Sequence, residues 1–593
     1  MTRIHRRAKK TAALVLAAAL SVSVLPTRAS AAYVNPNGCT QDNPCRYSPT
    51  IIVPGINQSV TYLYENGERT NLGSGIIFPD GDQNYLPVIG SLLASILTRF
   101  DICLSSNIYK LLCAMLEPQR VDSTGHFVND LRTDPIPRVS EMNDSQRHLN
   151  LNVNVPAHVL MEEIGEDHLY FYSFNLVDDI WNNVDGLEAF IDKVRAETGH
   201  DKVNLINVSL GGTVFTGYIE KYGHAKLDQV VNVVSCVDGS NMFADLIDHK
   251  AIQDEEFTRH VWLPEIVEHD IKIATGWDRT IGYALNVVLR ILPKRLLYKS
   301  VSAAWQAILD TVILNCSQFL ALIPRDRYDE IADKYLSGEE HAAVRDMTDR
   351  FHEAQMNLYS NIQAAVAAGV KVNNISGSNL YYGEGEYTFF RIAQSRLNSD
   401  GIIDLIGATM GATGAAPGET LPADYEPQAE GYLSPDGKID ASTALLPDNT
   451  WVFLDQPHEV GRNDAVLNLA AALLTNKIEN IHSDPENYPQ FNYFMLTNDL
   501  RRSRIAAAET LLADYPPELT AADREELLAA IAEGKAVRAL TVGDAERAAA
   551  ATQVLSDLLE KYGRFTPKAA QTDFQKAVEW LAEWISRLWM RLF

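Results

Sequence analysis

The chain has 593 residues, of which 46% are hydrophobic and 22% charged, with 25 prolines and 34 glycines. This composition is typical of a soluble globular protein and excludes a fibrous, a disordered or a polytopic membrane protein. The length predicts about two to four structural units, or one large domain with insertions. Because 77 acidic residues stand against 51 basic ones, giving a net charge of -26, nucleic acid is not an expected partner.

Residues 1–31 have the layout of a secretory signal peptide. A basic stretch to Lys10 is followed by an apolar run from Thr11 to Leu25 and by small residues up to Ala31. The apolar run is short for a stable membrane span, and an uncleaved anchor is the alternative. The sequence therefore predicts a secreted protein, cleaved after Ala31.

Export bears on the six cysteines, because the exterior permits disulfides. Cys39 and Cys45 are close in sequence, as are Cys103 and Cys113, so both pairs are candidates for local bridges. Cys236 ends an apolar strand and is a candidate free, buried thiol. No Cys-x-x-Cys pair or Cys/His cluster indicates structural zinc.

Short apolar runs alternate with segments of helical periodicity along the first and last parts of the chain. The expected strands are 51–53, 170–172, 203–206, 230–234, 370–375 and 451–454. The expected helices contain 187–194, run from the turn at 209 through 222, and begin at 465. Strands separated by helices in this way predict an α/β fold with a mainly parallel sheet covered on both faces.

The remaining segments suggest a division into regions after the signal peptide. We expect a core in two parts, 32–236 and 351–483, interrupted by a helical cap at 237–350 that contains apolar helices at 281–297 and 301–323. From 484 to 593 the chain is rich in Ala, Glu and Leu and is expected to be helical. Apolar residues recur at helical spacing from Phe574, so this last stretch is expected either to lie at a membrane surface or to dock on the protein body.

The chemistry centres on the segment Asn207-Val208-Ser209-Leu210-Gly211-Gly212, which lies between an apolar strand and an amphipathic helix. A serine becomes a nucleophile when a sharp strand-to-helix turn raises its hydroxyl towards a base. Ser209 is therefore the candidate nucleophile, and the N–H of Leu210 a candidate oxyanion donor. A serine that only caps a helix is the alternative.

A second turn follows the first expected strand, at Val53-Pro54-Gly55-Ile56-Asn57-Gln58. In a serine hydrolase this turn would supply the second oxyanion donor, here the backbone N–H of Ile56. A simple Pro-Gly turn is the alternative.

The turn at 53–58, the block 172–176, the elbow at 207–212 and the strand and loop at 233–240 together resemble the α/β-hydrolase lipases. They are most similar to secreted bacterial triacylglycerol lipases and to the lecithin:cholesterol acyltransferase-like group, over about 50–245 and 360–475. The chain departs from that pattern in having Pro54 where the family usually has His, and Asn207 and Val208 where it usually has Gly and His. The resemblance implies an α/β-hydrolase fold and a triad in the order serine, acid, histidine.

That order directs the search for the base and the acid. His458 lies in the loop after the last expected strand and is the candidate base, with His482 as the fallback. Asp400, in an Asn-Ser-Asp-Gly loop that resembles the acid loop of bacterial lipases, is the candidate acid. Asp404 is the alternate, whereas Asp455 lies too close to His458 in sequence.

These residues predict a secreted hydrolase that cleaves carboxylic esters with an apolar acyl part, through the triad Ser209, Asp400 and His458. The expected partners are a lipid or ester substrate and a lipid surface, contacted through the cap or the C-terminal helix. No cofactor or metal is expected, since Asp455 and Asp464 form only a short acidic cluster. Acyl transfer by the same fold and a catalytically silent binding protein remain the alternatives.

Overall fold

The structure is a computed structural model. It describes residues 47–563 except 57, 74–85, 135, 137, 152–156, 250–291, 382–396, 461–462, 493–495, 514–519 and 538–541. The expected signal peptide, Cys39, Cys45 and the amphipathic stretch from Phe574 lie outside the described residues.

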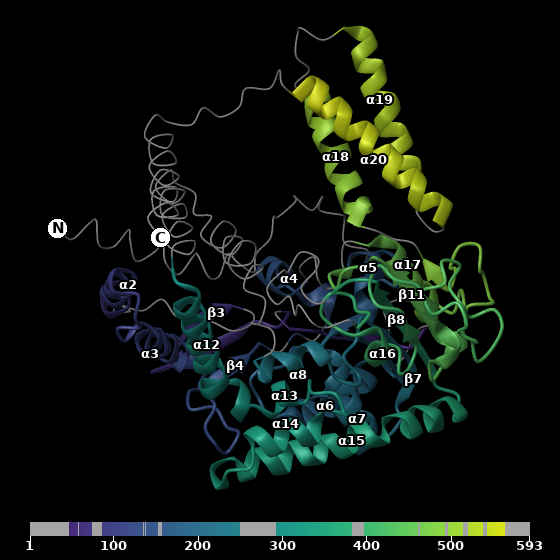
Figure 1. Ribbon diagram of the computed structural model, residues 1–593. Coiled ribbons are helices and arrows are strands. Elements are labelled where there is room, and N and C mark those ends of the chain that lie inside the picture. Colours follow the sequence, from purple (N-terminus) through teal and green to yellow (C-terminus); the bar gives the residue numbers. More distant parts are fainter. Residues whose placement is uncertain are drawn as a thin grey trace.

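A seven-stranded sheet forms the centre of the molecule (Figure 1). In spatial order its strands are β12 (Phe491–Asn492), β11 (Thr450–Leu454), β8 (Lys371–Ser378), β7 (Leu227–Val233), β6 (Val203–Val208), β1 (Thr50–Val53) and β5 (Leu169–Phe171). All six neighbouring pairs are parallel. Every residue of β1, β5, β6 and β11 is buried, which is typical of parallel strands covered on both faces.

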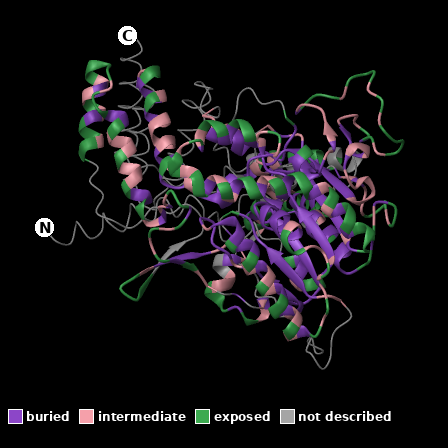
Figure 2. Ribbon diagram, turned by 90° about the horizontal axis from the view of Figure 1, so that it is seen from below, coloured by how far each residue is buried: buried purple, intermediate pink, exposed green. Residues whose placement is uncertain are grey.

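Helices cover both faces of this sheet. One face packs against α6 (Ile180–Thr198), α7 (Gly211–Tyr222) and α15 (Ala342–Ala367), and the other against α5 (His158–Glu163) and α17 (Asp464–Leu474). The helices turn their apolar residues inward, so that burial concentrates between helices and sheet while the outer helix faces stay exposed (Figure 2).

Smaller elements surround this core. An antiparallel sheet contains β3 (Glu68–Gly73), β2 (Thr61–Glu65) and β4 (Leu131–Thr133), and β9 (Thr413–Gly414) pairs with β10 (Ile439–Asp440). The helices α2 (Leu86–Thr98), α3 (Leu104–Leu116) and α12 (Lys294–Thr311) lie side by side at the edge of the molecule (Figure 1). The shorter helices are α4 (Asp144–Asn150), α8 (Asn241–Ile247), α13 (Ser317–Leu320), α14 (Tyr328–Tyr335) and α16 (Leu405–Ala408).

The described residues after the sheet form helices, as expected, but this helical region begins later than the expected boundary at 484. β12 at 491–492 adds an edge strand to the sheet, so the core extends past 483. The helices α18 (Leu496–Ala513), α19 (Ala521–Ala536) and α20 (Val542–Gly563) then pack around their own apolar cluster (Figure 1).

The expected cap differs from the structure in two respects. The apolar run 301–323 is not one helix, because α12 ends at Thr311 and the chain turns through Ile313–Asn315 before α13. The side chain of Asn315 donates to the carbonyl oxygens of Val121 and Asp310 at the break. In addition, the expected boundary at 350 falls inside α15, which packs on α7. Most of the other expected helix, 281–297, lies outside the described residues.

The candidate bridge between Cys103 and Cys113 does not form, since both thiols are free. Cys103 is the N-cap of α3 and Cys113 lies ten residues along it, about 15 Å away by the rise of an α-helix. A disulfide requires Cα atoms within about 7 Å. Cys236 is free and buried, as expected, and burial raises its thiol pKa well above the ordinary value.

The strand order identifies the fold class. From β1 the chain moves outward to β5 and then returns to β6 on the other side of β1. The carboxyl ends of β1 and β6 therefore flank the point where the winding reverses, which is where open α/β sheets place their sites. This parallel order, with a sharp serine turn after β6, defines the α/β-hydrolase fold and confirms the expected class. No helix in the described part of the chain is long and apolar enough to span a membrane.

Candidate active site

Ser209 occupies a strained turn between β6 and α7. Its φ of 52° lies in the left-handed region, which costs a residue with a side chain about 1–3 kcal/mol. Three backbone hydrogen bonds hold the turn: Ser209 N–H donates to Val233 O, and Ser209 O accepts from the N–H groups of Gly212 and Cys236. The strain is maintained by the surrounding structure, which is typical of a nucleophile elbow.

Two glycines permit the close packing around this turn. A Cβ on Gly211 would lie 2.3 Å from the carbonyl oxygen of Val53, and a Cβ on Gly55 would lie 2.7 Å from Cβ of Ser209. Larger residues would push β1 and the elbow apart. The close approach of β1 thus requires a glycine at position 211, while the proximity of Gly55 to Ser209 links the turn at 53–58 to the elbow.

The structure brings Ser209, His458 and Asp400 together from three separate segments. His458 follows β11, and its Nε2 lies 2.9 Å from Ser209 Oγ. Its Nδ1 lies 2.8 Å from Asp400 Oδ2. With Nδ1 protonated and donating to the carboxylate, Nε2 can accept the serine proton. This is the hydrogen-bonded order that a serine nucleophile requires of its base and acid.

Asp400 is fixed by its own loop after β8. Its side chain is fully buried, and its Oδ1 accepts hydrogen bonds from the N–H groups of Ile402 and Ile403 at 2.9 and 2.7 Å. The second oxygen, Oδ2, faces His458. The loop therefore satisfies one carboxylate oxygen and leaves the other to orient the imidazole.

Opposing effects set the pKa of His458. Burial disfavours the charged imidazolium, but the charge and hydrogen bond of Asp400, together with the charge of Glu459, favour it. The favourable effects prevail, so the pKa of His458 is raised above its ordinary 6.5. The site thus stabilises the imidazolium that forms when the base takes a proton.

The other candidates lie elsewhere. Asp404 accepts hydrogen bonds from the backbone and side-chain nitrogens of Asn241. Asp455 accepts from the side chain of Asn379, and the fallback His482 is exposed and lies 3.1 Å from Asp448. Among these candidates, only His458 has a hydrogen-bond contact with Ser209, and only Asp400 has one with His458.

The two expected oxyanion donors are Leu210 and Ile56, and Ile56 follows Gly55, which lies close to the serine. Leu210 directly follows Ser209 at the N-terminus of α7, where backbone N–H groups carry partial positive charge. Within the described part of the chain, no acceptor occupies the N–H of Leu210 or of Ile56. Sequence reasoning missed Gln58, which is buried and accepts from Gly55 N–H through Oε1 at 2.6 Å. This bond holds the turn next to Ile56.

A row of buried polar side chains crosses the sheet below the elbow. Asn207 Nδ2 donates to Asn232 Oδ1 at 2.9 Å, and Asn232 Nδ2 donates to Asn374 Oδ1 at 3.0 Å. Asn374 Nδ2 reaches Thr450 Oγ1 at 3.4 Å. These four residues, which we call the amide ladder, are neighbours in register on β6, β7, β8 and β11 and are fully buried. The departure from the lipase pattern at Asn207 is therefore matched by polar partners on the adjacent strands.

No group of three or more potential metal ligands occurs among the described residues. Of the short acidic cluster, the side chain of Asp464 lies outside the described residues, and Asp455 accepts a hydrogen bond from Asn379.

Comparisons with known proteins do not identify a family for this chain. No protein-family model and no curated protein sequence matches the chain. Among solved structures, the Tle4-Tli4 complex overlaps it with 13% identity and a TM-score of 0.26, over 56% of this chain and 75% of that one. A structure from work on carboxylesterases of the thaumarchaeon Nitrososphaera gargenis overlaps with 12% identity and a TM-score of 0.14, over 36% and 85%. At such TM-scores neither overlap carries a structural argument.

We predict that Asp400→Asn lowers kcat by roughly four orders of magnitude, because the amide cannot orient and stabilise the imidazolium. It should also move the acid limb of the kcat/KM profile to lower pH. The neutral imidazole is the active base, and losing the carboxylate lowers the pKa of His458, so the base stays neutral further into acid.

Asp404→Asn is the matched control, since it alters a buried carboxylate that contacts Asn241 instead of His458. It should change kcat little and leave the acid limb in place. If the two substitutions had equal, mild effects on ester turnover, Asp400 would not be the catalytic acid.

Proposed function

We propose that this protein is a serine hydrolase that cleaves carboxylic esters with an apolar acyl part. The observation that carries the proposal is the continuous set of contacts from Asp400 Oδ2 to His458 and from His458 Nε2 to Ser209 Oγ. An elbow serine in hydrogen-bond contact with a base, itself oriented by a buried carboxylate, is suited to acyl transfer.

In the proposed mechanism, Ser209 Oγ attacks the ester carbonyl while His458 Nε2 takes its proton. The N–H groups of Leu210 and Ile56 stabilise the negative charge that develops on the carbonyl oxygen. His458 then returns the proton to the leaving alcohol, leaving an acyl group on Ser209. Water, activated by the same histidine, releases the acid and restores the enzyme.

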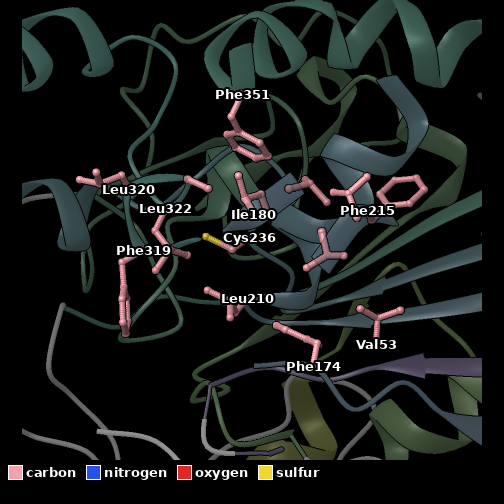
Figure 3. Packing of buried hydrophobic residues seen from close by; sticks show 14 of the residues in the cluster. Val53, Phe174, Ile180, Leu210, Phe215, Cys236, Phe319, Leu320, Leu322 and Phe351 are labelled. Carbon is pink, nitrogen blue, oxygen red and sulfur yellow. The ribbon is translucent and has the colours of Figure 1, made fainter. Parts of the chain in front are cut away.

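The surroundings of the serine support an apolar acyl group. Leu210, next to Ser209, belongs to a buried cluster that also contains Phe174 and Phe319 (Figure 3). Phe319 stacks on Phe243 with ring centroids 6.0 Å apart. An alkyl chain bound beside the elbow would meet hydrocarbon, which favours it over a small polar acyl group.

The proposed substrate class and cellular location rest on motifs in the sequence. These resemble secreted bacterial triacylglycerol lipases and lecithin:cholesterol acyltransferase-like enzymes, and residues 1–31 have the pattern of a signal peptide. We therefore propose that the enzyme acts outside the cell on lipid esters. Products analysed with and without an added alcohol distinguish hydrolysis, which gives free acid, from acyl transfer, which gives a new ester.

We predict that Ser209→Ala abolishes ester hydrolysis, by roughly six orders of magnitude in kcat, without altering the melting temperature by more than a few degrees. Ser235→Ala is the matched control. Ser235 is buried on the adjacent loop, and its Oγ has no hydrogen-bond partner among the described residues. A folded Ser209→Ala variant that retains more than a few per cent of activity would contradict the assignment.

We also predict that kcat/KM is higher for p-nitrophenyl decanoate than for the acetate, since each additional methylene buried beside Leu210 contributes about 0.8 kcal/mol at most. The comparison uses monomeric substrate at matched concentrations. A strict preference for acetate would show that the cluster around Phe174 and Phe319 is closed core and does not receive the acyl chain.

A further inference from the structure

The outer face of α2 is apolar and exposed. Six large apolar side chains there and just beyond the helix end are 44% to 82% exposed: Leu86, Ile89, Leu93, Leu97, Phe100 and Ile102. We call these six residues the α2 face. The first four recur every three or four residues and so form one stripe along the helix. A contiguous apolar stripe in water is unfavourable and indicates an interaction surface.

The inner side of α2 already has its partners. Leu92 and Ile96 pack against an apolar cluster on α12 that includes Leu296 and Leu297. The buried positions of the helix are Ser91 and Ser95. The hydroxyl of Ser91 donates to Pro87 O, and that of Ser95 accepts from Ile102 N–H.

The helix therefore buries its small polar residues and exposes its large apolar ones, which reverses the usual arrangement of a surface helix. Packing against α12 does not account for this pattern, because the exposed stripe takes no part in it. An environment that accepts hydrocarbon on the outer side would account for it.

The charge around α2 differs from that of the whole protein. The segments 86–116 and 294–311, which form α2, α3 and α12, contain five basic and two acidic residues, whereas the chain as a whole carries -26. Asp101, one of the two acidic residues, is paired with Lys299 at 2.5 Å. Arg99, Lys294 and Arg295 are exposed. Basic groups beside an apolar helix attract anionic lipid headgroups.

Few hydroxyl or amide side chains lie along α2 to bind a protein partner. From Leu86 to Thr98 they are Ser91 and Ser95, which are buried, and Thr98, whose hydroxyl donates to Ala94 O within the helix. Protein interfaces carry about one hydrogen bond per 100–200 Å², and such contacts fix how two proteins fit together. A lipid surface can hold an apolar helix without such specific hydrogen bonds.

We propose that the α2 face docks this protein on membranes that contain anionic lipid. The helix would lie in the plane of the interface, with the six apolar side chains among the acyl chains and Arg99, Lys294 and Arg295 at the headgroups. Its 13 residues extend about 20 Å, which is too short to cross a hydrocarbon core of about 30 Å. This docking goes beyond the proposed catalysis and can be measured without turnover.

The test is co-sedimentation of the full chain with vesicles of ether-linked phosphatidylcholine, with or without ether-linked phosphatidylglycerol, which contain no ester to hydrolyse. The protein should bind the vesicles with phosphatidylglycerol. The double substitution Leu93→Asp with Leu97→Asp should reduce the partition coefficient at least tenfold, with the melting temperature and soluble-ester activity unchanged.

The matched control replaces Leu528 and Val554 with Asp. These residues are 42% and 50% exposed on the C-terminal helices, and the control should bind like the parent. Replacing Lys294 and Arg295 with Glu should remove the preference for phosphatidylglycerol.

Four results would overturn the proposal. In the first two, the parent protein does not bind vesicles, or it binds both kinds of vesicle equally. In the other two, the control variant loses as much vesicle binding as the α2 variant, or the α2 variant binds as well as the parent. A change from dimer to monomer on substituting Leu93 and Leu97, seen by sedimentation velocity, would instead identify the α2 face as a contact with a second copy.

Discussion

The amide ladder ties together the strands on which the candidate site depends. Ser209 follows β6, while the loops with Asp400 and His458 follow β8 and β11, so the site requires these strands to keep a fixed register. A buried amide that loses its partner costs about 1–3 kcal/mol, and a slip in register would leave several without one. The ladder begins at Asn207 because the facing residue of β1 is Val53, which offers no polar side chain. Asn207 Oδ1 has no hydrogen-bond partner among the described residues.

Much of this architecture could be predicted because it depends on local patterns. The main strands are uninterrupted apolar runs, the elbow has a glycine at the required spacing, and Asp400 and His458 follow their strands in the order that the winding imposes. The assignment of catalytic roles to these residues stays a prediction. The geometry is what hydrolysis requires.

Other features escaped prediction because they depend on contacts between distant segments. Asn232 and Asn374 look unfavourable in strands when each is read alone, and only the parallel register makes them partners. Gln58 acquires its role from the fold of its own turn. Hydropathy predicts one helix over 301–323 because it does not record that Asn315 donates to carbonyl groups at the break. Proximity in sequence makes Cys103 and Cys113 a candidate pair, but an α-helix holds residues ten positions apart too far from each other for a disulfide.

The central claim is that Ser209 is an activated nucleophile, and covalent labelling measures this most directly. The folded protein is treated with a fluorophosphonate, which reacts with serines activated by a base, and the modified peptide is identified by mass spectrometry. The account predicts one adduct per molecule, located on Ser209 and absent from the protein unfolded before treatment. Folded protein that remains unlabelled, or that carries its adduct on another serine such as Ser235, would contradict it.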